Sequence, residues 1–218
     1  MSRASTATRK ATKGEFIETD SGNKVWRRAH ISGAPNITLG GKTVIQADVQ
    51  LRGDLARVQP PRSQGDGKAA PVNHSISIGR CTIVSAGSVI KPPHRVSKRE
   101  VDGRAVKEVH YYPMKISDNV FIGPNCTIQA ANIGQHVHIG EGCVLQALCV
   151  VKENVKILPY TVVPPNMTIP SNSVVGGRPA RIVGELGDGW GMTTGSAGGD
   201  NEGWVEGGDL RELVRAIR

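Results

Sequence analysis

The sequence predicts an all-β fold, a single-stranded parallel β-helix of hexapeptide repeats with a short C-terminal helix. Its main sign is an aliphatic residue at almost every sixth position, whereas a helix repeats at about 3.6 residues and a half-buried strand at 2. In a β-helix each hexapeptide is one short strand and a corner, and the aliphatic side chain points into a prism. The predicted core positions are Leu39, Ile45, Leu51, Ile78, Val84, Ile90, Ile116, Ile122, Ile128, Ile133, Ile139, Leu145, Val151, Ile157, Val163, Ile169 and Val175.

Two further observations agree with this fold. Four residues after most aliphatic positions stands a smaller or slimmer residue, as a core only one side chain deep requires. Aromatic residues are only 4% of the chain and 27 of its 218 residues are Gly, which suits tight corners around a thin core. The smaller residues include Cys126, Val137, Cys143, Cys149, Val155, Thr161, Met167 and Ser173.

The chain before the repeats, residues 1–13, is basic and contains no acidic residue. It superficially fits a mitochondrial presequence, but it lacks the leucines or aromatics that would form an apolar face. We therefore expect a disordered basic tail. Its basic residues are Arg3, Arg9, Lys10 and Lys13.

The β-helix is expected over residues 14–183, with loops near 57–75 and 91–115. The second loop is rich in basic residues, so it either meets an acidic partner protein, anionic lipid or nucleic acid, or is simply solvated. Nucleic acid is disfavoured, because aromatic residues for base stacking are scarce and no recognised module is present. The residues concerned are Lys91, His94, Arg95, Lys98, Arg99, Arg104 and Lys107.

The last part of the chain is predicted as a Gly-rich linker over 184–208 and a short amphipathic helix over 209–218. The linker contains Trp190 and Trp204 and is not expected to be ordered alone. Asp209 can cap the helix, which is too short to be stable by itself. We expect it to dock on the β-helix, with another subunit as the alternative. Its apolar face consists of Leu210, Leu213, Val214 and Ile217.

Bulk properties favour an intracellular protein. The formal net charge is +8, and there is neither a run of about 18 apolar residues nor a hydrophobic signal segment, so no membrane span is expected. Three of the four cysteines fall on inward positions and no CxxC spacing exists. We expect them to be reduced and to act as small hydrophobic side chains, with Cys81 more exposed near a corner.

Many hexapeptide-repeat β-helices are acyltransferases, so an acyltransferase is one alternative for this chain. The stretch Gly-Gly-Arg-Pro-Ala-Arg at 176–181 looks like the ending of many acetyltransferases, but its Pro and glycines also have a purely geometric use at the last corner. A transferase would need a general base, usually His, on an outer face. The candidates are His110, His136 and His138. His136 and His138 flank the inward Val137, and we expect them to be ordinary surface histidines.

A smaller branch of these proteins consists of carbonic anhydrases, and Arg52-Gly53-Asp54 resembles the Arg-Gly-Asp segment of that family. Their zinc ion needs three histidines on the following coils. The matching coils here, 78–89 and 120–129, contain none. Without imidazole ligands a zinc-bound hydroxide cannot form at neutral pH. We therefore expect no catalytic residues, no metal and no cofactor.

Several segments between residues 14 and 186 carry one further resemblance. They read ETDSGNKV at 18–25, NITLGGKTVI at 36–45, LRGDLARV at 51–58, SVIKPP at 88–93, ISDNV at 116–120, AANIG at 130–134 and GEL at 184–186. Together these segments resemble the family of twenty-five-kilodalton subunits of the dynactin pointed-end complex. Departures are the basic tail before Gly14, longer loops near 59–75 and 98–109, and the Gly-rich linker.

The resemblance implies a non-enzymatic subunit with a left-handed β-helix, in the cytoplasm and on the cytoskeleton. The subunit would pair with a second β-helix subunit and, with an actin-related protein and a zinc-binding subunit, cover the pointed end of dynactin's filament. There it would help recruit cargo adaptors and endosomes to dynein. The handedness rests on this resemblance and on hexapeptide habit, because ordinary crossovers are right-handed.

We expect the contact surface for a partner in the segment 91–114, since it leaves the prism and carries charge beside two tyrosines. The alternative is that the Pro pair merely directs the chain out of the coil. The candidate partner-binding residues are Lys91, Pro92, Pro93, Lys98, Tyr111 and Tyr112.

Overall fold

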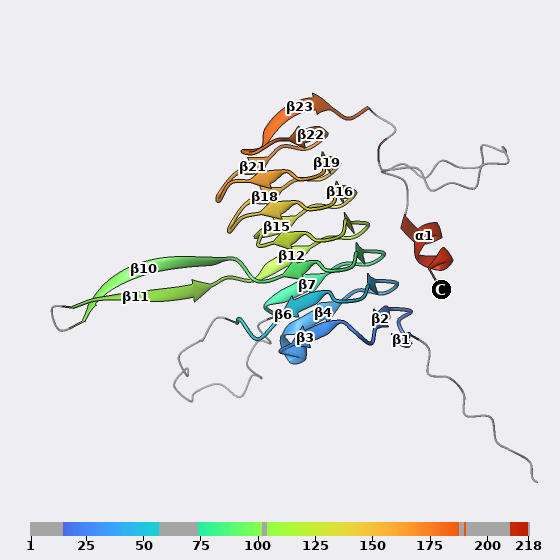
Figure 1. Ribbon diagram of the computed structural model, residues 1–218, viewed down its shortest axis with the longest axis horizontal. Helices are drawn as coiled ribbons and strands as arrows, with labels where there is room; N and C mark the ends of the chain where they lie inside the picture. Colours follow the sequence, from blue (N-terminus) through green and yellow to red (C-terminus); the bar gives the residue numbers. More distant parts are fainter. Residues whose placement is uncertain (1–14, 57–73, 102–103, 188–189, 191–209, 218) are drawn as a thin grey trace, which may run out of the picture.

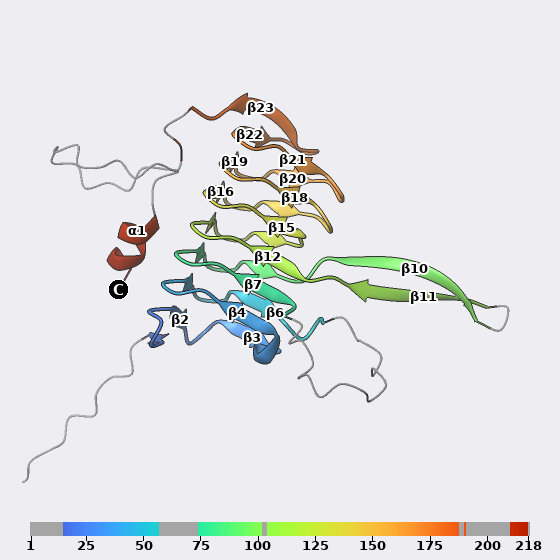
Figure 2. The ribbon, with the colours of Figure 1, turned by 180° about the vertical axis from the view of Figure 1, so that it is seen from behind.

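A computed structural model describes residues 15–56, 74–101, 104–187, 190 and 210–217. The predicted fold class is confirmed: three parallel sheets form the sides of a prism, and a short helix lies against one side (Figures 1 and 2). The predicted tail over 1–13 and most of the predicted linker fall outside the described residues. In the part of the chain that is described, no helix is long and apolar enough to span a membrane.

We call the three sides faces A, B and C, in the order in which the chain visits them. Each strand pairs with the strand one coil earlier and one coil later, so the sheets run the length of the prism. Face A contains β1 (Phe16–Glu18), β2 (Lys24–Trp26), β5 (Val44–Ile45), β8 (Ile83–Val84), β13 (Phe121–Ile122), β16 (Val137–Ile139), β19 (Val155–Ile157), β22 (Ser173–Gly176) and β23 (Arg181–Glu185).

The other two faces have six strands each. A 3-10 turn, Ala34–Asn36, precedes the first strand of face C. Face B contains β3 (His30–Ser32), β6 (Gln50–Arg52), β9 (Val89–Ile90), β14 (Thr127–Ile128), β17 (Val144–Leu145) and β20 (Val162–Val163). Face C contains β4 (Ile37–Leu39), β7 (Ile76–Ile78), β12 (Met114–Ile116), β15 (Asn132–Ile133), β18 (Val150–Val151) and β21 (Thr168–Ile169).

The core is a column of stacked aliphatic side chains. On face A, Ile122 pairs with Ile139, which pairs with Ile157 on the next coil. Of the predicted core positions, only Leu39 is not fully buried; it lies partly exposed against the same cluster near the first coils. Because each inward residue packs on its neighbours above and below, every coil contributes a similar increment of burial.

The two ends of face A are covered by antiparallel strands. β1 pairs with β2 at one end, and β23 pairs with β22 at the other. An open strand edge is a template for further pairing, so these two strands protect the ends of this face.

The segment near 91–115, predicted as a loop, contains a two-stranded β-hairpin. β10 (His94–Val101) and β11 (Arg104–Tyr111) pair antiparallel and project from the prism (Figure 1). The hexapeptide pattern could not predict it, because hairpin strands alternate at 2 residues. The sequence between the strands is Asp-Gly, a pair typical of two-residue hairpin connections.

The hairpin and the other interruption share one corner of the prism. The chain leaves after β6 and returns at β7, and one coil later it leaves after β9 and returns at β12. Both departures lie between face B and face C. We call this the B–C corner.

Helix α1 (Leu210–Ala216) docks on face A, as expected for an apolar helix too short to stand alone. Leu210 and Val214 are 2% and 4% exposed, and they pack on Val44 and Ile83 of the outer surface of the sheet. The proposed cap, Asp209, lies outside the described residues. Leu210 N–H instead donates to the Asn119 side chain at 2.8 Å.

Candidate partner-binding surfaces

The six candidate partner-binding residues lie at and along the hairpin, but they differ in accessibility. Pro92 and Pro93 are buried, and Lys91, Tyr111 and Tyr112 are half-buried at its base. Lys98, in the middle of β10, is exposed. The structure thus brings five of the six together at the B–C corner, where the prolines support the chain as it leaves the coil and do not offer a free surface.

The base of the hairpin is tied to the prism. Lys91 N–H donates to the carbonyl of Ile128 at 3.1 Å, and Tyr112 N–H donates to the carbonyl of Pro93 at 2.9 Å. The rings of His94 and Tyr111 lie 5.9 Å apart across the two strands. These contacts fix the direction in which the hairpin leaves the corner.

Valines on the hairpin are surface residues that the sequence pattern did not single out. Val96, Val106 and Val109 are 52%, 49% and 46% exposed. Val96 pairs directly with Val109, and Lys98 pairs with Lys107, so one face of the ribbon carries two valines followed by two lysines. Like charges opposite each other destabilise a strand pair, and an isolated hairpin is marginally stable. An acidic, partly apolar partner would compensate for both.

The outer surfaces of faces B and C are flat and different in chemistry. On four strands of face B the outward residues form an in-register ladder of half-buried β-branched side chains, whereas the outward residues of face C are largely polar. Flat sheets of this kind can be covered by another flat surface. The ladder on face B consists of Val89, Thr127, Val144 and Val162.

The Arg52-Gly53-Asp54 segment forms a compact turn at the B–C corner. Arg52 Nε and Nη2 donate to the two Asp54 carboxylate oxygens, each at 2.8 Å. The Gly53 carbonyl accepts from Asn36 Nδ2 and Ser75 Oγ, each at 3.0 Å. The segment therefore ties its own turn and two neighbouring parts of the chain together, a structural use that needs no metal.

This pairing shifts the pKa values of both Arg52 and Asp54. The hydrogen bonds from Arg52 hold the pKa of the Asp54 carboxyl below its ordinary value, and the same bonds raise the pKa of Arg52. The pKa of Asp54 is lower in the folded state than in the unfolded state. The pair therefore stabilises the fold at pH values above the pKa of an unfolded aspartate, about 3.9. That contribution is lost as the pH falls through the folded-state pKa.

We expect the Asp54 carboxyl, followed by nuclear magnetic resonance, to titrate below an ordinary aspartate. Arg52→Gln should move the midpoint upward, since it removes the hydrogen bonds that cause the shift. Arg28→Gln is the control, because Arg28 pairs with Asp48 instead, at 2.9 Å. An Asp54 midpoint that is unaffected by Arg52→Gln would contradict this assignment.

The three candidate histidines have different surroundings. His110 is on the hairpin, where its Nε2 lies 3.0 Å from Ser97 Oγ. His136, at a corner, lies 2.8 Å from the Asn119 side-chain nitrogen, and the His138 ring stacks on Phe121 with centroids 4.7 Å apart. Within the described residues, no three His, Cys, Asp or Glu side chains lie together in a way that could hold a metal ion.

All four cysteines are free thiols. Cys126, Cys143 and Cys149 are buried in the core, as their positions in the repeat predict, and Cys81 is half-buried at a corner. Burial raises the pKa of Cys149 to about 12, so this thiol stays protonated at neutral pH. By their burial, all three of these residues pack as small side chains in the core.

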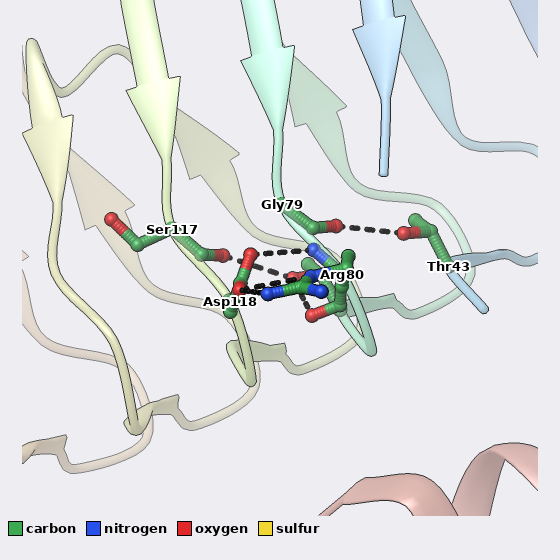
Figure 3. A network of polar contacts seen from close by, with 6 residues as sticks. Thr43, Gly79, Arg80, Ser117 and Asp118 are labelled. Atoms are coloured by element: carbon green, nitrogen blue, oxygen red, sulfur yellow. Dashed lines mark hydrogen bonds and ion pairs between the residues drawn. The ribbon is translucent and has the colours of Figure 1, made fainter. Parts of the chain in front are cut away.

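The corner between faces C and A carries a polar network across three coils (Figure 3). Thr43 Oγ donates to the Gly79 carbonyl at 2.8 Å, and Arg80 N–H donates to Asp118 Oδ1 at 2.8 Å. The Arg80 guanidinium also pairs with Asp118, at 3.2 Å. A cavity of about 450 Å³ beside this network is lined by Ser21, Gly41, Lys42, Arg80, Cys81, Asp118, Asn119 and Arg211.

The coils, corners and ladders described above define a hexapeptide-repeat β-helix protein. The family model described as Dynactin subunit 5 matches residues 8–191. The chain therefore belongs to the Dynactin subunit 5 family, and the sequence resemblance is confirmed.

Individual curated proteins are similar to part of this chain. The chain is 38% identical over 122 residues to Dynactin subunit 5 of Dictyostelium discoideum, covering 56% of this chain and 48% of that protein. It is 27% identical over 115 residues to the mitochondrial Gamma carbonic anhydrase 2 of Arabidopsis thaliana, covering 53% and 38%. The chain thus spans half or less of the length of these curated relatives.

Among solved structures, the N-acyltransferase AntD of Bacillus cereus has a similar fold. The TM-score is 0.54 at 11% sequence identity, covering 76% of this chain and 80% of that one. At such low identity the likeness concerns the fold alone.

Proposed function

We propose that this chain is a non-catalytic scaffold subunit of the dynactin pointed-end complex, in the cytoplasm and on the cytoskeleton. It pairs with a second β-helix subunit and contacts the pointed-end actin-related protein and a zinc-binding subunit. In that position it helps dynein and dynactin engage cargo adaptors and endosomes. The observation that carries the proposal is the match of the Dynactin subunit 5 family model to residues 8–191.

The geometry of the prism is compatible with a scaffold to which other subunits bind. The flat faces offer surfaces for neighbouring subunits, and so do β3, β4 and β21, which within the described residues pair with a strand on one side only. The hairpin reaches away from the prism by about 24 Å, at about 3.4 Å per residue, so it can contact a partner that the flat faces do not touch. Its exposed valines and lysines favour an acidic, partly apolar partner.

An enzyme is the alternative, because relatives include carbonic anhydrases and the fold is shared with acyltransferases. Zinc content measured together with carbon dioxide hydration tests the first activity, and acetyl-coenzyme A binding by calorimetry tests the second. We expect neither turnover nor binding. Stoichiometric zinc with turnover, or tight coenzyme binding, would overturn the scaffold proposal.

The hairpin contact is tested by charge reversal. We expect Lys91→Glu with Lys98→Glu to weaken capture of cargo adaptors roughly ten-fold, since an exposed charge contributes up to about 1 kcal/mol and a ten-fold change in affinity is about 1.4 kcal/mol. The measurement is adaptor binding to the purified assembly at two salt concentrations, because exposed charge pairs are screened by salt.

The matched control is Lys152→Glu with Arg181→Glu. Both residues are exposed and lie on the later coils of the prism, Lys152 directly after β18 and Arg181 on β23. They should leave capture unchanged, and circular dichroism should show the same folded state for all variants. Equal capture by the hairpin variant and the control would remove the hairpin from the contact surface.

A further inference from the structure

The outer surface of face A carries an apolar stripe that α1 covers. Val44, Ile83 and Phe121 follow one another in register on adjacent strands, and they belong to an apolar cluster that is separate from the core. Leu210 and Val214 of α1 pack in the same cluster and are buried there. The docking of α1 therefore decides whether this stripe is covered or meets water.

One side chain of the prism holds the first described residue of α1. Asn119 is buried, and its side-chain oxygen accepts from Leu210 N–H at 2.8 Å. A main-chain N–H can only donate, so this bond fixes the amide with its oxygen toward α1 and its nitrogen on the other side. That nitrogen lies 2.8 Å from Nδ1 of His136, which occupies the same corner of the prism one coil later.

The orientation of this amide determines where His136 carries its proton. An amide nitrogen donates and does not accept, so Nδ1 of His136 has to be the acceptor and the ring proton belongs on Nε2. A protonated imidazole has an N–H at both ring nitrogens, and its Nδ1–H would face the N–H of Asn119. Rotation of the amide would offer the oxygen to His136 instead, but the amide nitrogen would then face Leu210 N–H. A protonated His136 and the bond to Leu210 therefore exclude each other.

The same corner holds the C-terminal segment at a second point. The carbonyl of His136 accepts from Nε1 of Trp190 at 2.9 Å. Trp190 and α1 are the two described parts of the chain that follow residue 187. Both of them are thus held at the corner formed by Asn119 and His136.

Other charged and titratable groups surround this corner and α1. The Asp118 carboxylate pairs with Arg80 at 3.2 Å, and the His138 ring stacks on Phe121, which packs against α1. Carboxyl groups ordinarily titrate near about pH 4, and Lys and Arg above about pH 10, so histidine is the residue type that changes charge between about pH 5 and 8. His138 is thus the group from which an experiment must distinguish His136. The remaining charged groups are Lys24, Lys42, Glu153, Lys156, Arg211 and Arg215.

We propose that His136 and Asn119 form a pH-sensitive latch for α1. When His136 is neutral, its Nδ1 atom holds the Asn119 amide in the orientation that binds Leu210. Protonation of His136 favours the opposite orientation of the amide, in which Asn119 no longer accepts from α1. Acidification therefore loosens α1 and uncovers the apolar stripe on face A.

Hydrogen exchange of the full chain at about pH 8 and about pH 5.5 tests the latch. Protection factors of the α1 amides, corrected for the intrinsic exchange rate at each pH, should be about five-fold lower at the acidic pH, the size expected for the loss of one hydrogen bond. The amides of β20 and β22 should keep their protection, because these strands lie on later coils. Equal protection of α1 at both pH values would overturn the proposal.

His136→Asn separates the latch from other causes of acid sensitivity. Oδ1 of Asn takes the place of the imidazole Nδ1 along the side chain, accepts from Asn119 and cannot be protonated. Asn also suits the backbone, since His136 has a φ of 55° and Asn119, Asn154 and Asn172 have φ values of 59°, 53° and 56° at the same place in other coils. The acid-induced fall in protection should shrink to less than about two-fold. A fall as large as in the unaltered chain would assign it to another group, such as His138, and would overturn the proposal.

Asn119→Asp should remove the acid sensitivity in a different way. The carboxylate keeps one oxygen for Leu210 N–H and turns the other toward His136, where it accepts from the protonated imidazole. Protection of α1 in this variant should be at least as high at the acidic pH as at the alkaline one, and a fall like that of the unaltered chain would contradict the latch.

The nitrogen chemical shifts of the His136 ring provide a check that needs no variant. In the unaltered chain at about pH 8 they should show the ring proton on Nε2, and a proton on Nδ1 would overturn the proposal. None of these outcomes depends on whether the chain is a dynactin subunit.

Discussion

Ile139→Ala should lower the free energy of unfolding by about 3 kcal/mol. Ile139 is fully buried and stacks between Ile122 and Ile157 on the neighbouring coils. Removal of a large aliphatic side chain loses its transfer free energy and leaves a cavity, at a typical cost of about 2–5 kcal/mol. The coils cannot easily close that cavity, because hydrogen bonds between successive strands fix their spacing.

Urea unfolding followed by circular dichroism measures this effect. Val183→Ala is the control, since Val183 on β23 is 59% exposed and its substitution should change stability by about 0.5 kcal/mol or less. A similar urea midpoint for Ile139→Ala and Val183→Ala would mean that the stacked aliphatic side chains of the core do not stabilise the fold as described.

Gly79→Ala should also destabilise the fold, by about 2 kcal/mol or more. A Cβ atom at position 79 would lie 2.5 Å from the Ser117 backbone carbon and 2.4 Å from Asp118 Oδ1. The clash is with the main chain of the next coil, so no side-chain rotation relieves it, and overpacking of this kind costs about 1–3 kcal/mol or more. It would also disturb the network of Figure 3, in which the Gly79 carbonyl accepts from Thr43.

The melting temperature of Gly79→Ala, compared with Gly184→Ala, measures this cost. Gly184 has ordinary space for a methyl group, since its nearest contact would be Val174 at 3.8 Å. Both substitutions lower chain entropy in the same way, so the difference between them isolates the clash. Equal melting temperatures for the two variants would show that the coils around Gly79 are stacked less closely than in this structure.

Much of the fold follows from the spacing of aliphatic residues alone. A six-residue step, shortened to five between Ile128 and Ile133, sets the register of the coils, so it also predicts which side chains point inward. Leu39 is the exception, because it lies near the first coils, where fewer neighbours cover it. The hairpin was missed because its strands do not follow the repeat, although Asp102-Gly103 was a local signal for it.

The candidate surfaces were less predictable, because they depend on contacts between distant parts of the chain. Pro92 and Pro93 were expected in a contact surface because their segment leaves the prism, but the structure shows that both are buried. The hydrogen bond from Leu210 to Asn119 joins residues 91 positions apart. The apolar residues Val44, Ile83 and Phe121 were visible one place before an inward residue, yet they form a stripe only once the strands are in register.

Gentle affinity purification of the tagged chain from its native cell, followed by mass spectrometry, tests the scaffold assignment most directly. We expect actin-related proteins, a second β-helix subunit and dynein components to be recovered with the chain in fixed proportions. Recovery of the chain alone as a homotrimer, the usual state of hexapeptide-repeat enzymes, would contradict it.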